Sequence, residues 1–154
     1  MTAPTTPAVT RVDELRLRPV VTVAPNAPLD QVARIMRAHN VSALVVGHPG
    51  DPIAIVTERD LTQALADRCP PGERVVAIAS SNPLTIAHDA SVMEAATLML
   101  NRCLRHLVVS RQHRVVGIVS IRDVLAALVS AVTPDTVFVR LQRITIDAPE
   151  NWLG

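Results

Sequence analysis

Apolar residues follow two kinds of spacing along this chain, one typical of strands and one typical of helices. Short apolar or β-branched runs, which favour buried strands, lie at residues 20–24, 43–46 and 53–57. Between the first two runs, four residues recur at the i, i+3, i+4, i+7 spacing that puts them on one helix face: Leu29, Val32, Ala33 and Met36. A second helical pattern covers residues 58–67. The predicted order is therefore β-α-β-β-α.

The same pattern occurs again 63 residues further along the chain. Residues 11–65 align on residues 74–128 without a gap, and 16 of the 55 pairs are identical. Such a register indicates two copies of one structural unit. A unit of roughly 50 to 60 residues buries too little surface to be stable alone, so we expect the two copies to pack together.

The second copy supports the elements read from the first. Its expected strands and closing helix lie at 83–87, 106–109, 115–120 and 121–131. The matching apolar helix face consists of Val92, Ala95, Ala96 and Met99. Ser91 and Glu94 form the pattern of a capping box at the start of that helix, whereas Pro28 is expected in the first turn of its counterpart.

The chain divides into four expected parts. Residues 1–10 are rich in Pro and Thr and read as a disordered tail that lacks the apolar segment of a signal peptide. Residues 11–70 and 71–132 form the first and second domains. Residues 133–154 lie outside the repeat, and their alternating apolar positions predict an extra strand that covers a sheet edge or reaches a partner subunit.

Composition argues against several classes of function. The chain has no Tyr, and its two aromatic residues, Phe138 and Trp152, lie near the C-terminus, which disfavours modules that stack nucleic-acid bases. The net charge of +1 favours neither a nucleic-acid surface nor an anionic membrane. No apolar run approaches the roughly 20 residues of a membrane-spanning helix. We therefore expect a cytoplasmic protein without nucleic-acid or membrane partners.

The sequence contains no pattern of a catalytic or metal centre. Cys69 and Cys103 are far apart, and no His residue has ligand-type spacing to Cys, Asp or Glu, so no metal site is expected. Cys103 falls in an apolar helical pattern, which predicts a buried free thiol. No nucleophile-elbow, Walker or zincin motif is present, so we expect no enzymatic activity.

Two segments carry a resemblance to a known family. The segments "AIVTERDL" at 54–61 and "GIVSIRDV" at 117–124 resemble the motif that closes a CBS domain: Gly, two apolar residues, Thr or Ser, two variable residues and Asp. The openings "VVTVAPNAPLDQVARIM" and "PLTIAHDASVMEAATLM" resemble the family's beginning. The chain is thus similar to a tandem CBS domain pair, or Bateman module, from residue 11 to about residue 131.

The resemblance implies a fold and a function. It implies a mixed α/β fold in which two β-α-β-β-α repeats pack through their sheets with pseudo-twofold symmetry, leaving two clefts. Such modules typically form homodimers, bind AMP, ADP or ATP, and regulate an attached or associated protein. For this chain the resemblance implies a stand-alone regulatory module with an adenine nucleotide ligand, no required cofactor and a separate regulated protein.

The suspected nucleotide sites follow an apolar strand and begin a helix, where unpaired backbone N–H groups favour an anion. The resemblance implies that Asp60 and Asp123 bind the ribose and that Thr57 and Ser120 lie beside the phosphate. Arg59 and Arg122 could neutralise phosphate charge, and Arg105 and His106 could assist. The positions expected near the base are Val20, Thr22, Pro83, Thr85, Ala43 and His106. Ala54, which replaces the Gly117 of the second copy, is expected to narrow the backbone's approach to a ligand in the first.

Alternative interpretations remain for the same residues. A Ser or Thr followed three residues later by Asp is also an ordinary helix cap, and Val20 and Thr22 suit a strand core equally well. A scaffold or interaction protein with empty clefts, or a regulatory subunit of an enzyme, would carry the same repeat.

Overall fold

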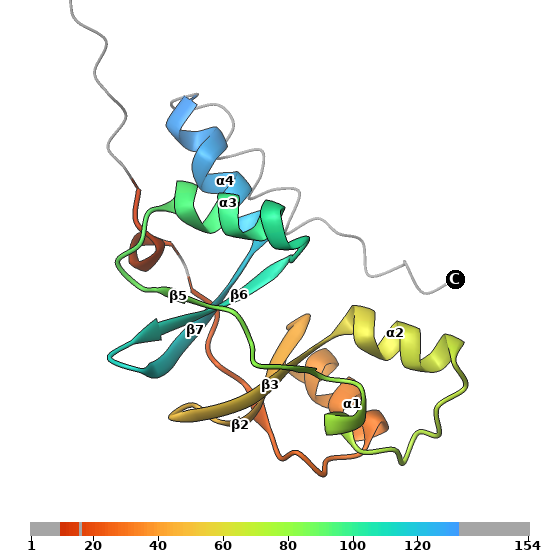
Figure 1. The fold of residues 1–154 in the computed structure, drawn as a ribbon. Helices are drawn as coiled ribbons and strands as arrows, with labels where there is room; N and C mark the ends of the chain where they lie inside the picture. The colour runs from red at the N-terminus through yellow and green to blue at the C-terminus, as the bar shows by residue number, and fades with distance from the viewer. Residues whose placement is uncertain (1–9, 16, 133–154) are drawn as a thin grey trace, which may run out of the picture.

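The computed structural model describes residues 10–15 and 17–132, which form two sheets and four α-helices (Figure 1). Figure 1 shows α1 and α2 at one end and α3 and α4 at the other, with the strands between them. The mixed α/β class and the twofold β-α-β-β-α order are confirmed. The expected tail before residue 10 and the extra strand expected within residues 133–154 lie outside the described residues.

The strands of the first repeat and β4, from the opening segment of the second, form a four-stranded sheet in the order β1-β2-β3-β4. Strand β1 runs parallel to β2, and the other neighbours are antiparallel. Helix α1 follows β1, and helix α2 follows β3 directly. The bounds are β1 Thr22–Val23, α1 Leu29–His39, β2 Ala43–His48, β3 Asp51–Thr57, α2 Glu58–Ala66 and β4 Ser80–Ser81.

The second repeat builds a three-stranded sheet in the order β5-β6-β7. Its bounds are β5 Thr85–Ala87, α3 Val92–Arg102, β6 His106–Arg111, β7 Arg114–Ser120 and α4 Ile121–Val132. Thr22 pairs with Val45, and the equivalent Thr85 pairs with Val108. Both hairpins also change register at the same place, after Val46 and after Val109. The two repeats therefore share a backbone register as well as a sequence pattern.

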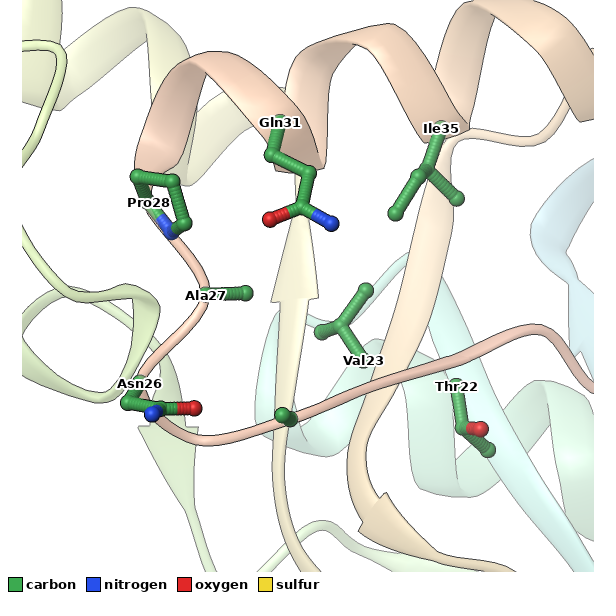
Figure 2. A pocket seen from close by; sticks show the side chains of 8 residues that line it. Thr22, Val23, Asn26, Ala27, Pro28, Gln31 and Ile35 are labelled. Carbon is green, nitrogen blue, oxygen red and sulfur yellow. The ribbon is translucent and has the colours of Figure 1, made fainter.

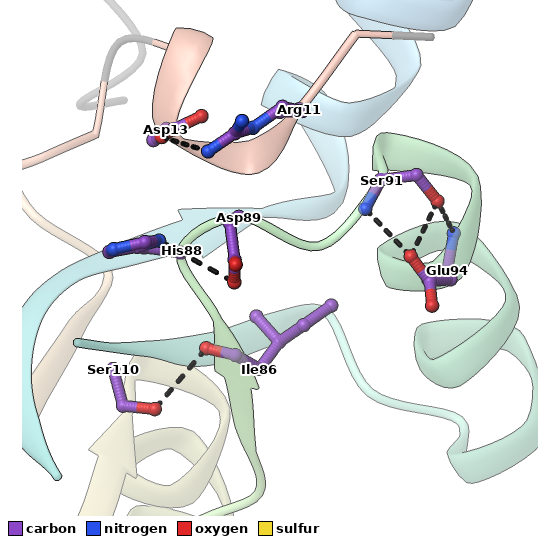
Figure 3. Close-up of polar contacts among 8 residues, drawn as sticks. All are labelled: Arg11, Asp13, Ile86, His88, Asp89, Ser91, Glu94 and Ser110. Carbon is purple, nitrogen blue, oxygen red and sulfur yellow. Dashed lines mark hydrogen bonds and ion pairs between the residues drawn. The ribbon is translucent and has the colours of Figure 1, made fainter. Parts of the chain in front are cut away.

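The helix ends follow local chemistry. At α3, Ser91 Oγ accepts a hydrogen bond from the Glu94 N–H at 3.1 Å, and a Glu94 carboxylate oxygen accepts one from the Ser91 N–H at 2.7 Å (Figure 3). The predicted capping box is confirmed. The hydrogen bonds that the Ser91 N–H and Oγ–H donate to the carboxylate lower the pKa of Glu94. Pro28 is the N-cap residue of α1, one position before the expected first turn.

Cys103 differs from expectation. Helix α3 ends at Arg102, and Cys103 adopts the left-handed conformation of a helix C-cap, with φ 51°. Asn40 takes the same conformation at the end of α1. The thiol is exposed, because the next residue, Leu104, packs against the core instead. The prediction of a buried thiol is therefore wrong.

Each repeat gives its opening segment to the core of the other. Val12 of the short 3₁₀ helix Val12–Glu14 is fully buried in the core of the second repeat, together with the partly buried Leu15 and Leu17. Val75 of the equivalent 3₁₀ helix Val75–Ala77 is fully buried in the core of the first repeat. The red segment in Figure 1 accordingly lies beside β5 and α3.

Equivalent backbone hydrogen bonds hold both exchanged segments. The Val12 N–H donates to the Ala90 carbonyl at 2.9 Å, and the Val75 N–H donates to the Ala27 carbonyl at 2.8 Å. Further along, Arg18 forms an isolated bridge with Ile118, and β4 pairs with β3 at the equivalent place. These interactions join the repeats into one intertwined unit.

Gly117 serves this exchange. A Cβ atom at Gly117 would lie 3.0 Å from the Cβ atom of Leu17, which is tighter than ordinary van der Waals contact. The space above Gly117 is therefore occupied by the opening segment. At Gly117 the close neighbour is therefore Leu17. The expectation that Ala54 narrows the approach to a ligand in the first repeat stays a prediction.

The two sheets meet through a small apolar cluster. It consists of the buried residues Ala43, Val45, Val108, Val115 and Ile118, with Val20 and Ile55 packed against it. Neighbouring residues on β2, such as Leu44 and Val46, instead face the core of their own repeat. Strands β2 and β6 thus bury both faces, which explains their unbroken apolar runs. No helix in the described part of the chain is long and apolar enough to cross a bilayer.

Candidate ligand-binding cleft

A cleft of about 470 Å³ lies between the repeats at the start of α4. Both repeats line it, because the exchanged opening segment brings Arg18 and Pro19 beside the end of β7. Its walls are Arg18, Pro19, Asn40, Val41, Ser42, Ala43, Glu58, Arg105, His106, Ile118, Ser120, Ile121 and Arg122. Apolar and strongly basic side chains therefore share one cavity.

Four of the predicted site residues line this cleft: Ala43, His106, Ser120 and Arg122. Asp123 lies next to it and is hydrogen-bonded to Ser120. Thr57, Arg59 and Asp60 occupy the equivalent helix start of the first repeat and do not line the cleft. Val20 packs against the apolar cluster between the sheets. Pro83 and Thr85 lie at the opening of the second repeat, where Thr85 is exposed.

Thr22 lines a different cavity of about 370 Å³ between β1 and the start of α1 (Figure 2). Its other walls are Val23, Ala24, Asn26, Ala27, Pro28, Gln31 and Ile35, none of which carries a charge. The first backbone N–H groups of α1 already donate to protein carbonyls, Leu29 to Glu73 and Asp30 to Pro71. This cavity offers no charge or unpaired helix-start amide for an anion.

Both Ser/Thr–Asp pairs cap a helix. The Ser120 N–H and Oγ–H donate to Asp123 Oδ2 at 2.9 and 2.6 Å, and the Asp123 N–H donates back to Ser120 Oγ at 3.3 Å. Thr57 and Asp60 form the same arrangement, with distances of 2.7, 2.7 and 3.4 Å. The capping interpretation is thus confirmed for both pairs. It uses Oδ2 of each carboxylate, so a second role would fall to Oδ1.

His106 is the half-buried titratable group of the cleft. Its Nε2 lies 2.9 Å from Ser42 Oγ, a hydrogen bond that links the second repeat to the first. Burial lowers the pKa of His106 below its ordinary value, and the guanidinium groups of Arg105, Arg18 and Arg122 lower it further, whereas Asp123 raises it. Burial and the three cationic side chains therefore favour the neutral imidazole.

Most of the basic side chains of this cleft have no basic counterpart at the equivalent positions of the other repeat. The positions 63 residues away from Arg18, Arg105 and His106 hold Ser81, Ser42 and Ala43. Of the four basic residues, Arg122 alone has a basic counterpart, Arg59. The two repeats therefore supply the same backbone but different charges, and the positive potential gathers at the start of α4.

Sequence reasoning missed several wall residues, notably Arg18, Pro19, Asn40 and Ile118. The repeat pairs positions that are equivalent, whereas this cleft joins positions that are not. The basic residue Arg18, which aligns with the uncharged Ser81, was the available signal. No group of three or more potential metal ligands occurs among residues 10–15 and 17–132.

Comparison with known proteins agrees with this architecture. The CBS domain family matches residues 12–67 and 75–130. A protein of Methanopyrus kandleri is 33% identical over 118 residues, covering 74% of this chain and 60% of its own length. This chain thus spans less than two thirds of that relative.

Solved structures show the same fold. A CBS domain protein of Pyrobaculum aerophilum complexed with AMP is 30% identical, with a TM-score of 0.70, covering 88% of this chain and 98% of its own. The CBS domain pair of protein MJ0100, in complex with 5′-methylthioadenosine and S-adenosyl-L-methionine, is 26% identical with a TM-score of 0.73, covering 82% and 100%. With both repeats matched, this chain belongs to the CBS domain family and carries two CBS domains in tandem.

Proposed function

We propose that this chain is a regulatory module that binds one adenine nucleotide in the cleft at the start of α4. The observation that carries this proposal is the convergence of Arg18, Arg105 and Arg122 on one cavity beside the Ser120–Asp123 cap. The volume of the cleft, about 470 Å³, is ordinary for a small-molecule site. The AMP bound to the similar Pyrobaculum aerophilum protein supports an adenine ligand.

The wall residues suit the three parts of a nucleotide. Guanidinium groups bind phosphate oxygens with charge-assisted hydrogen bonds, so the phosphate lies among the arginines. The ribose hydroxyls lie within reach of Asp123, whose Oδ1 is not used by the cap. The base packs against the apolar part of the wall: Val41, Ala43, Ile118 and Ile121.

Binding regulates through the relative position of the repeats. The ligand touches both repeats, because Arg18 and Ser42 come from the first, and Arg105 and Arg122 from the second. A ligand that contacts both stabilises one arrangement of the pair, and a partner protein that distinguishes arrangements responds to it. The module carries no catalytic step of its own in this proposal.

Matched substitutions at the two caps test the site. Asp123→Ala and Asp60→Ala each remove the same helix cap, so both should lower the stability of the protein by a similar amount, about 0.3–1.5 kcal/mol. AMP at a hundred times its dissociation constant should stabilise the wild type by about 2.7 kcal/mol, which raises the unfolding midpoint by several degrees. We expect Asp123→Ala to abolish this rise and Asp60→Ala to retain it, measured by thermal unfolding.

Other results would assign the chain differently. Loss of the AMP effect in Asp60→Ala alone would move the site to the first repeat. If AMP, ADP, ATP and S-adenosylmethionine all leave the midpoint of the wild type unchanged, the ligand proposal fails. The alternative of a scaffold with empty clefts would then explain the fold better.

Two chains associate through helices α3 and α4 in this proposal. Leu100 on α3 is 73% exposed and Leu125 on α4 is 56% exposed, which is unusual for large apolar side chains on two neighbouring helices. A second copy would cover them. Light scattering should report twice the chain mass for the wild type, and a single chain mass for Leu100→Arg with Leu125→Arg. Leu65→Arg, at an exposed leucine on α2, is the control that keeps the dimer.

A further inference from the structure

His106 stands where the two repeats and the basic side chains of the cleft meet. It begins β6, and its Nε2 is 2.9 Å from Ser42 Oγ of the first repeat. Histidine is the side chain whose ordinary pKa lies within the physiological range, so its charge responds to small changes of environment. Arginine stays protonated throughout that range. His106 is thus the wall residue suited to change its charge when the content of the cleft changes.

Four charged groups act on His106. Arg18 comes from the opening segment, Arg105 precedes β6, and Arg122 and Asp123 belong to α4. Glu58 of α2 lines the same cleft. Burial and the three arginines favour the neutral imidazole, and Asp123 opposes them. With the cleft empty, burial is the largest influence on His106 and lowers its pKa, although Asp123 opposes it more strongly than any single arginine assists it. The imidazole then shares one hydrogen bond with Ser42.

A bound phosphate reverses this balance. It brings close to two negative charges and several acceptor oxygens, which offset the repulsion from the three guanidinium groups. A protonated imidazole donates from both ring nitrogens, so it can keep Ser42 as acceptor and donate its other N–H to the phosphate. The charged form of His106 therefore gains more from the ligand than the neutral form does.

We propose that His106 takes up a proton when a phosphate-bearing ligand enters the cleft, so that the module binds such a ligand more tightly as the pH falls. This inference rests on the proposed function, and it adds a regulatory input, the proton concentration, to the same site. Its sign follows from linkage: the pKa of His106 is higher in the complex than in the free protein, so affinity rises as the pH falls from the upper value to the lower. Above and below that window the effect of His106 on affinity is constant.

Calorimetric titration with AMP between pH 6 and 8 tests the inference. The wild type is compared with His106→Gln, which keeps a hydrogen-bonding side chain that cannot be protonated. The phosphate of free AMP itself titrates near pH 6, and this contribution is common to the two proteins. We expect the affinity of the wild type to rise relative to that of His106→Gln by severalfold, and by at most about tenfold per pH unit. Repeating the titration in buffers of different ionisation enthalpy should show proton uptake for the wild type and less for the variant.

Each outcome decides between the proposals. If the affinities of wild type and His106→Gln change with pH in parallel, the proton-uptake proposal is overturned while nucleotide binding stands. If AMP binds neither protein at any pH, the proposed function fails and this inference fails with it. An NMR pH titration of the wild type tests the proposal without the variant. On addition of AMP the titration of the His106 ring should shift to higher pH, whereas that of the exposed His113 should not.

Discussion

Replacing Val12 by aspartate is expected to destabilise both repeats together, although Val12 lies at the beginning of the first and its side chain is buried in the core of the second. Its side chain is fully buried in the core formed by residues of α3, β6 and α4. A carboxylate placed there has no cationic partner, and such burial costs at least about 4 kcal/mol. Native proteins of this size are stable by only about 5–15 kcal/mol. Because the cores are intertwined, urea unfolding should show one transition with its midpoint strongly lowered.

Val76→Asp is the matched control. Val76 is 45% exposed, and the equivalent position of the opening segment already holds an aspartate, Asp13. The same substitution should therefore change the stability by no more than about 0.5 kcal/mol. Two separate transitions in Val12→Asp, with the first repeat still folded, would contradict the view that the exchange makes the pair one cooperative unit.

Arg122→Ala is expected to weaken nucleotide binding strongly, whereas Arg59→Ala is expected to leave it nearly unchanged. The two residues hold equivalent positions one residue before the capping aspartates, but Arg122 alone lines the cleft. A hydrogen bond to a charged group contributes about 1.5–3 kcal/mol, which corresponds to a ten- to hundredfold change of the dissociation constant. Calorimetric titration of both variants with AMP measures the difference.

The pair of arginines also tests stoichiometry. We expect one bound nucleotide per chain in the wild type and in Arg59→Ala. Two nucleotides per chain, with both arginines contributing equally, would show that the first repeat binds despite Ser81, Ser42 and Ala43 at the positions of the missing basic residues.

The fold was predictable because the repeat supplied two independent readings of each element. Helix α1, strands β2 and β3 and their counterparts lie where apolar spacing placed them. Cys103 was misplaced because periodicity does not reveal where a helix ends: the left-handed conformation at Cys103 lets Leu104 take the buried position. At Gly117 the sequence indicated that some group approaches the backbone closely, but it could not show that this group is Leu17 of the opening segment.

The site was less predictable than the fold, for a physical reason. Ser120 and Arg122 were found because they follow a strand and begin a helix, a local feature visible in the sequence. Thr22 and Val20 were assigned to the base by their place in the opening strand, but Thr22 faces another cavity and Val20 packs between the sheets. The opposite wall, with Arg18 and Asn40, comes from the other repeat. Its position depends on the exchange of opening segments, which no local sequence pattern indicates.

The exchange of opening segments also bears on synthesis at the ribosome. The first repeat lacks part of its core until Val75 and Ile78 have emerged, although its own helices and central strands are complete by residue 66. The core around Val12 is complete only when Leu107, Val119 and Val124 have followed, about a hundred residues later. At roughly 5–20 residues per second, the opening segment therefore waits for seconds with its apolar side chains unburied. Translation order therefore leaves this segment accessible to a chaperone until the second repeat is complete.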